Sequence, residues 1–248
     1  MSKPGSAYSV AEISEALVDK IHAAAVAKIG APSKPRTDST PAKQHASTLV
    51  YTSHKIIAIG ASTGGTRAIE EVLSGLPANS PGTLIVQHMP EHFTTGFAQR
   101  LGEICPMEVR EARNSDLVTP GVALIAPGNY HMLLRRSGAR YSAVVKTGPQ
   151  VHHQRPSVDV LFHSVAKHAG PNAVGVILTG MGSDGAKGLL AMHEAGAPTL
   201  AQDEASCVVF GMPREAIALG AAEHVVPLNR MSARIIEMVS RPTAAVPC

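Results

Sequence analysis

Residues 55–76, KIIAIGASTGGTRAIEEVLSGL, predict the unit from which the fold is built. Lys55–Gly60 is a short apolar run typical of a buried strand, and Thr66–Leu76 is expected to be helical. Between them, Gly60–Gly64 matches G-x-S-x-G, a motif whose glycines permit a tight turn that exposes the serine hydroxyl above the sheet. Ser62 is therefore a candidate nucleophile. A Gly-rich turn with an idle serine is the alternative, because the chain contains 22 glycines.

The same alternation of apolar runs and helical segments continues along the chain. It predicts an α/β fold, a doubly wound mostly parallel sheet with helices on both faces, since continuous apolar strands are buried on both sides. Two further runs flank Ser137-Gly138-Ala139 and favour an antiparallel β-hairpin at one edge of that sheet. The expected strands are Thr83–Gln87, Val109–Glu111, Ala123–Ala126, Met132–Arg135, Ala143–Lys146, Ala173–Leu178, Thr199–Ala201 and His224–Val226. The expected helices are Thr94–Ile104, Pro156 to about His168, Ala186–Ala195, one from Pro213 and one from Met231.

The two ends of the chain differ from this central part. Apolar residues spaced by three or four predict a helix over residues 10–29, and the following segment is rich in Pro, Ser, Thr and Lys. We expect residues 1–52 to be an N-terminal helix and an interdomain linker, residues 53–240 a catalytic domain, and residues 241–248 a tail.

Composition limits the class of protein. Apolar residues make up 44 % of the 248 residues, enough for a sizeable core, whereas aromatics are 3 % and the net charge is +3. With no dense Lys/Arg run and few rings to stack on bases, nucleic-acid binding is not expected. The sequence shows neither a signal-peptide core nor an apolar run long enough to span a membrane, so we expect a cytoplasmic protein without membrane insertion.

Two more polar residues follow predicted strands at the edge where Ser62 is expected. His88 ends the second strand, and Asp184 lies in the loop GMGSDG (180–185) after the strand Ala173–Leu178. Open α/β sheets place their sites at the carboxyl ends of the strands. His88 is thus a candidate general base, and Asp184 is either its orienting partner or a helix cap.

Two other arrangements use the same residues. A dinucleotide-binding loop would need a glycine where Ser62 stands and an acidic residue after the second strand, which instead ends in Gln87-His88. An α/β-hydrolase order would pair Asp184 or Asp203 with the later His224. His224 opens its strand, however, at the opposite edge of the sheet.

The remaining histidines give weaker indications. His152 and His153 are expected in a solvated loop, and His163 and His168 are five residues apart on one helix. With no Cys or carboxylate at ligand spacing, we expect no metal site.

Six segments, in order, resemble the catalytic domain of the CheB family, the chemotaxis protein-glutamate methylesterases and glutamine deamidases. They extend over most of the region from Lys55 to Val239. The segments are IAIGASTGGT (57–66), VQHMP (86–90), IAPGNYHM (125–132), RPSVDVLFHSVA (155–166), GVILTGMGSDGAKG (175–188) and AQDEASCVVFGMPREA (201–216).

The resemblance implies a mechanism and a partner. It implies Ser62 as nucleophile, His88 as base, Asp184 as its orienting residue, and Thr63 and Met181 as active-site support. No cofactor or metal is implied, and the implied partner is the cytoplasmic domain of methyl-accepting chemoreceptors. Full-length relatives are expected to carry a receiver domain, for which residues 1–52 are too short. A nucleotide-binding oxidoreductase and a non-catalytic signalling scaffold remain the alternative functions.

Overall fold

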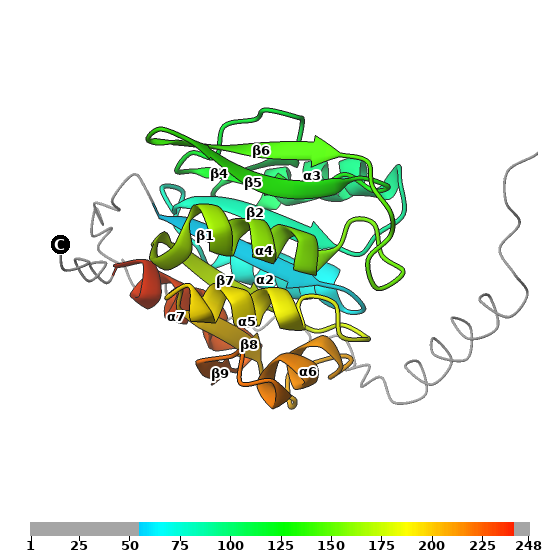
Figure 1. Cartoon of the computed structure of the whole chain (residues 1–248), viewed down its shortest axis with the longest axis vertical. Helices are drawn as coiled ribbons and strands as arrows, with labels where there is room; N and C mark the ends of the chain where they lie inside the picture. Colours follow the sequence, from blue (N-terminus) through cyan, green and yellow to red (C-terminus); the bar gives the residue numbers. More distant parts are fainter. Residues whose placement is uncertain (1–54, 241–248) are drawn as a thin grey trace, which may run out of the picture. The chain divides into compact units, whose positions relative to one another are not determined.

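A seven-stranded sheet is the centre of the structure, a computed structural model that describes residues 55–240 (Figure 1). The strand order is β3-β4-β2-β1-β7-β8-β9, and every neighbouring pair is parallel. Its strands are β1 (Ile56–Ala61), β2 (Gly82–Gln87), β3 (Glu108–Glu111), β4 (Val122–Ile125), β7 (Ala173–Ile177), β8 (Thr199–Gln202) and β9 (His224–Val226). The predicted helix over 10–29, the linker and the tail at 241–248 lie outside the described residues.

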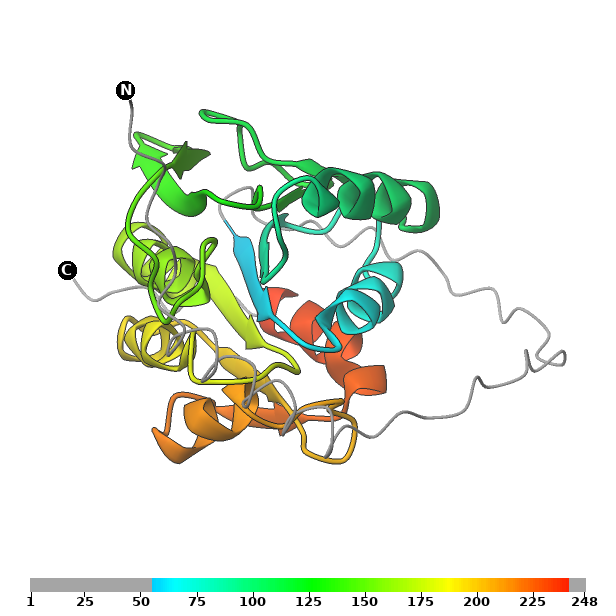
Figure 2. The same cartoon turned by 90° about the vertical axis from the view of Figure 1, so that its right-hand side faces the viewer.

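Helices cover both faces of this sheet, as the sequence predicts (Figure 2). One face carries α4 (Val158–His168), α5 (Ala186–Glu194) and α6 (Met212–Ala218). The other carries α2 (Gly65–Ser74), α3 (Phe93–Ile104) and α7 (Leu228–Ser240). Side chains of β1 alternate between two separate hydrophobic clusters, since Ile56 and Ala58 pack with the first group of helices and Ile57 and Ile59 with the second. Because both faces of β1 are buried, every residue along it must be apolar, which explains its continuous apolar run.

The predicted hairpin is present as a sheet of its own. Strands β5 (His131–Ser137) and β6 (Arg140–Lys146) pair antiparallel and do not extend the seven-stranded sheet. The hairpin lies against α4, where the Leu134 N–H donates to the Ser164 hydroxyl over 2.8 Å, and its buried residues join the core of that face. Its location differs from the expected sheet edge because its apolar side is covered by a helix rather than by another strand.

Helix starts differ slightly from the sequence prediction. Helix α4 begins at Val158 rather than Pro156, because Ser157 is its N-cap and accepts the N–H of Val160. A 3₁₀ turn, η1 (Gly170–Asn172), then leads into β7. Helix α7 begins three residues earlier than expected, directly after Pro227.

The strand order places a switch point at the centre of the sheet. From β1 the chain builds β2, β3 and β4 on one side, and then returns through α4 to build β7, β8 and β9 on the other. In open α/β sheets the crevice for a ligand forms outside the carboxyl ends of the strands at such a point. Here that location lies between the loops that follow β1 and β7.

Candidate active site

Ser62 lies in the turn between β1 and α2, at the carboxyl edge of the sheet. Its N–H donates to the Thr179 carbonyl over 3.0 Å, and its carbonyl accepts the N–H of Gly65 over 2.8 Å. Gly64 has a φ of 81°, and a Cβ there would lie 2.6 Å from the Val208 side chain. Glycine is therefore required at residue 64 both by the left-handed backbone and by the close approach of a second loop.

The first turn of α2 begins beside the Ser62 side chain. No side chain caps this helix. Its first N–H groups lack partners within the helix and carry the positive end of the helix dipole, so this end of α2 suits a negatively charged oxygen. Ser62 is partly accessible and Thr63 is exposed, so a substrate can reach the turn.

Gln87 connects the serine turn to the histidine on the next strand. Its side-chain amide donates to the Ser62 carbonyl over 2.9 Å and to the His88 carbonyl over 3.0 Å. The side chain is buried, and Gly65 leaves the space that it occupies, since a Cβ there would lie 2.2 Å from the Gln87 Oε1. In the sequence, Gln87 indicates only that the second strand lacks the acidic residue of a dinucleotide site, and nothing there indicates this structural role.

His88 and Asp184 form a buried pair at the same edge. The His88 Nε2 lies 2.7 Å from the Asp184 Oδ2, and the two side chains are 6 % and 2 % exposed. Among the described residues, the other ring nitrogen of His88, Nδ1, is buried and has no hydrogen-bond partner. Because Asp184 accepts at Nε2–H, Nδ1 carries the free lone pair of the neutral ring and can accept a proton.

The N-terminus of α4 holds the Asp184 carboxylate. Oδ1 accepts the Ser157 hydroxyl at 2.8 Å and the Asp159 N–H at 3.0 Å, and Oδ2 accepts the Val158 N–H at 2.7 Å in addition to His88. Burial by itself raises the pKa of Asp184, but the hydrogen bond and charge of His88, with the N–H groups of Asp159 and Val158, outweigh it and lower the pKa. The carboxylate is thus held ionised and oriented toward His88.

Thr179, which follows β7, links the serine turn to the loop before α6. Its hydroxyl lies 3.0 Å from the Thr63 carbonyl and accepts the N–H groups of Val208 and Val209 at 3.1 and 3.0 Å. The next residue, Gly180, packs directly on Ser62, because a Cβ there would lie 2.7 Å from the Ser62 Cβ. Met181 follows and is partly buried.

His224 lies at the other edge of the sheet. It begins β9, its Nε2 is 2.8 Å from an Arg234 nitrogen and 3.3 Å from a Glu223 oxygen, and Asp203 is bonded instead to Ser206. The Ser-Asp-His order through His224 is therefore not assembled.

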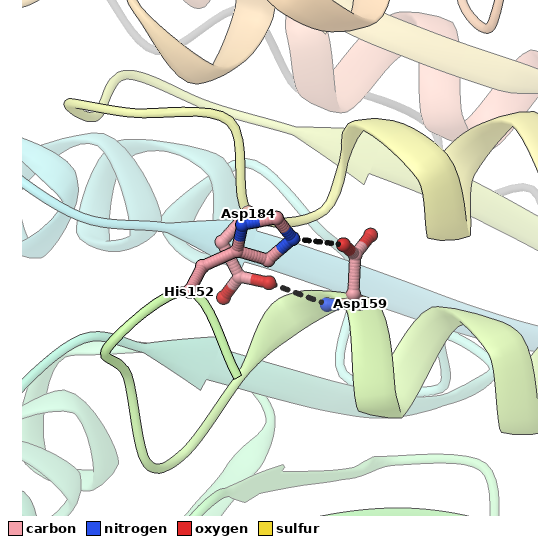
Figure 3. Close-up of side chains that lie close together, drawn as sticks. All are labelled: His152, Asp159 and Asp184. Atoms are coloured by element: carbon pink, nitrogen blue, oxygen red, sulfur yellow. Dashed lines mark hydrogen bonds and ion pairs between the residues drawn. The ribbon is translucent and has the colours of Figure 1, made fainter. Parts of the chain in front are cut away.

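A second group of side chains lies beside Asp184, where the sequence predicted only a solvated loop and no metal site. One ligand atom from each of His152, Asp159 and Asp184 lies within 4.8 Å of the others (Figure 3). The sequence does not indicate this group, because the loop between β7 and α5, which carries Asp184, comes next to His152 and Asp159 only in the folded chain.

No helix within residues 55–240 has the length and hydropathy needed to cross a bilayer.

Comparison with known proteins gives consistent matches. The family described as CheB methylesterase matches residues 57–235. A protein-glutamate methylesterase/protein-glutamine glutaminase 2 of Syntrophus aciditrophicus (strain SB) is 56 % identical over 239 residues, which are 96 % of this chain and 70 % of the relative. A protein of the same description from Salmonella typhi is 57 % identical over 227 residues, 92 % of this chain and 64 % of its own length. The crystal structure of the Thermotoga maritima CheB methylesterase catalytic domain superposes with a TM-score of 0.73 at 37 % identity, covering 75 % of this chain and all of that one.

Proposed function

The chain belongs to the CheB methylesterase family, and from this premise we propose that it is a serine hydrolase acting on chemoreceptors. It hydrolyses glutamate methyl esters to release methanol, and it deamidates glutamine side chains to release ammonia. The observation that carries this proposal is the convergence of Ser62, His88 and Asp184 on one sheet edge, with the His88–Asp184 bond buried.

In the first half of the reaction, the Ser62 oxygen attacks the ester carbonyl while its proton passes to the Nδ1 of His88. Asp184 stabilises the resulting imidazolium through Nε2, 2.7 Å away. The proposal requires a Ser62–His88 hydrogen bond in the substrate complex, where such bonds tighten. Collapse of the tetrahedral intermediate breaks the bond to the methoxy oxygen, which takes the proton from His88 and leaves as methanol.

In the second half, water hydrolyses the acyl-enzyme. His88 takes a proton from the water, the oxygen attacks the acyl carbon, and the proton returns to Ser62 as free glutamate leaves. A glutamine substrate follows the same course, with ammonia in place of methanol. No step uses a metal or an organic cofactor.

Two groups of donors are suited to the oxyanion of both intermediates. One is the first turn of α2 after Gly65, and the other is the loop at Met181, whose neighbour Gly180 packs against Ser62. The N–H groups of Gly65 and Gly180 are not part of either group, because they donate to the carbonyls of Ser62 and Val209. Thr63 contributes by holding the turn, because its carbonyl receives the Thr179 hydroxyl. We assign Thr63 and Met181 to support of the site rather than to proton transfer.

The substrate is proposed to be the helical cytoplasmic part of a methyl-accepting chemoreceptor. The names of the relatives specify protein glutamate and glutamine side chains, and an exposed turn at Thr63 admits a side chain presented by a protein surface. A net charge of +3 suits an acidic partner surface.

The test is methanol release from receptor membranes carrying methyl-esterified glutamates. We compare the native chain with Ser62→Ala and with Ser183→Ala, a control at another partly accessible serine in the loop beside Asp184. Release by the native chain and the control, with a loss of about 10⁴-fold or more in Ser62→Ala, supports the reaction and the nucleophile. Equal release by native and Ser62→Ala enzyme rejects Ser62, and no release by the native chain rejects the proposed substrate.

A further inference from the structure

A second histidine–aspartate pair lies directly behind His88 and Asp184. The His152 Nε2 is 2.9 Å from the Asp159 Oδ2, and Asp159 is in turn bonded to Asp184 through its backbone N–H (Figure 3). Since a carboxylate only accepts hydrogen bonds, the Nε2 of His152 is the donor. The four residues thus form a hydrogen-bonded chain from the surface to the buried ring of His88, in which the backbone N–H of Asp159 makes the link to Asp184.

Asp159 connects the two helices that determine the position of Asp184. It lies in the first turn of α4 and is buried. Its N–H donates to the Asp184 Oδ1 at 3.0 Å, while its own Oδ1 accepts the N–H of Gly188, in the first turn of α5, at 2.6 Å. Asp184 lies just before α5, so Asp159 fixes the start of both helices around the carboxylate that orients His88.

The loop that carries His152 holds an unfavourable backbone. His152 and His153 have φ values of 51° and 57°, a region that costs an L residue roughly 1 kcal/mol or more. Val151 and Gln154 exchange backbone hydrogen bonds of 3.1 and 2.9 Å and close the loop around them. This conformation directs the His152 side chain inward to Asp159, although 34 % of that side chain remains exposed.

The arrangement fits a hydrogen-bond network better than a cation site. Both Asp184 oxygens already accept two donors each, and Asp159 accepts one donor on each oxygen. Three of these donors are backbone N–H groups in the first turns of α4 and α5. Their hydrogens point at the carboxylate lone pairs that a bound cation would use.

We propose that His152 and Asp159 are positioning residues for Asp184 in the hydrolysis of the ester. This inference rests on the proposed function. Without the donor from His152, the Asp159 carboxylate becomes more exposed to water and its hydrogen bond to the Gly188 N–H weakens. The Asp184 carboxylate is then less firmly fixed relative to the His88 ring. The pair acts on the chemical step, because its hydrogen bonds lead to Asp184 and to the start of α5.

The experiment measures kcat and KM for methanol release with the full chain carrying His152→Ala, His152→Gln or His153→Ala. The Gln amide places a donor near the position of Nε2, so it restores the bond to Asp159. His153 is a matched control, because it is a neighbouring exposed histidine with the same backbone region. We expect His152→Ala to lower kcat about 10-fold at unchanged KM, and His152→Gln and His153→Ala to stay within about 2-fold of the native chain.

Three outcomes overturn the proposal while leaving the esterase function intact. These are an unchanged kcat in His152→Ala, a loss in His152→Gln as large as in His152→Ala, and a change confined to KM, which would place the loop in substrate binding. Loss of the esterase function itself is recognised separately, by a native chain that releases no more methanol than Ser62→Ala.

Asp159→Asn provides a second measurement, should His152→Ala unfold. It retains an oxygen for the Gly188 N–H and removes the charged acceptor of His152. Thermal unfolding identifies which variants are folded. Because the two residues act as one unit, kcat of the double variant should equal that of Asp159→Asn alone. Losses that multiply in the double variant would show independent roles and reject the proposal.

Discussion

The amino and carboxyl edges of the seven-stranded sheet each hold a histidine beside an acidic residue, and the two histidines are held in different ways. His88, at the carboxyl edge, is 6 % exposed and faces a carboxylate that three other donors hold in place. The side chain of His224, at the amino edge, is 29 % exposed, and that of the neighbouring Glu223 is 39 % exposed. The two sites differ in desolvation and in how firmly the acid is fixed.

The ring nitrogens differ as well. Arg234 lies 2.8 Å from the Nε2 of His224, and because a guanidinium only donates, it occupies the lone pair of that nitrogen. His88 offers its Nε2–H to Asp184, and its Nδ1 remains open among the described residues. An acidic neighbour alone is therefore not enough for a histidine to act as a general base. The ring nitrogen that does not bond to the acid must also have an open lone pair within reach of the nucleophile.

The largest effect expected from this comparison is in paired substitutions of the two histidines. His88→Gln should lower kcat for methanol release by about 10⁴-fold or more, because no group then takes the Ser62 proton. His224→Gln should keep kcat within about 2-fold, since His224 is remote from the crevice. A comparable loss in both variants would mean that the amino edge contributes to the reaction, contrary to the comparison.

Asp184→Asn tests how the fixed acid contributes, and Asp203→Asn is its control at the carboxyl end of the adjacent strand. Replacing the carboxylate by an amide should lower kcat by about 10³–10⁴-fold, because the amide does not stabilise the imidazolium. The loss of charged hydrogen bonds should also lower the free energy of unfolding by about 2 kcal/mol at neutral pH.

The pH dependence of that stability difference follows from the lowered pKa of Asp184. A carboxyl whose folded pKa is depressed contributes stability above its unfolded pKa and loses it as the pH falls through the folded value. Denaturant unfolding of the native chain and Asp184→Asn should therefore differ most near pH 7 and converge below about pH 4. A difference that is constant from pH 7 to pH 3 would show that the contribution of Asp184 is not ionic.

Much of the fold follows from the sequence because its strands are apolar runs separated by helices of regular period. The same signal does not say which sheet a strand joins, and the hairpin β5–β6 accordingly forms its own sheet on α4. Which strands pair depends on packing between segments that are distant in the chain, and the spacing of apolar residues along one strand does not contain this information.

Strand ends determine where the three proposed catalytic residues lie. Ser62, His88 and Asp184 each follow a buried strand, so the common edge of a parallel sheet brings them together. The roles of Gln87 and Thr179 are not evident from the sequence, because their bonds join segments far apart in the chain, as between Thr179 and Thr63. For these two, a glycine beside the contact, such as Gly65 against Gln87, is the one trace that the sequence carries. The His152–Asp159 bond spans only seven residues, but it depends on the left-handed backbone of the loop before α4, which no glycine marks.

The smallest effect that we expect concerns Thr179, whose hydroxyl donates to the Thr63 carbonyl in the turn that carries Ser62. Thr179→Val keeps the shape and leaves the N–H groups of Val208 and Val209 without their acceptor, so unfolding should become easier by about 1–3 kcal/mol. Thr199→Val is the matched control, because that buried hydroxyl accepts the Glu223 N–H at 3.1 Å near the amino edge of the sheet.

Both variants should be less stable in urea unfolding. Only Thr179→Val should also lower methanol release, by about 10-fold, because the native Thr179 hydroxyl donates to the Thr63 carbonyl. Equal activity in the two variants would mean that the turn around Ser62 keeps its shape without Thr179, and that the carboxyl edge depends on His88 and Asp184 alone.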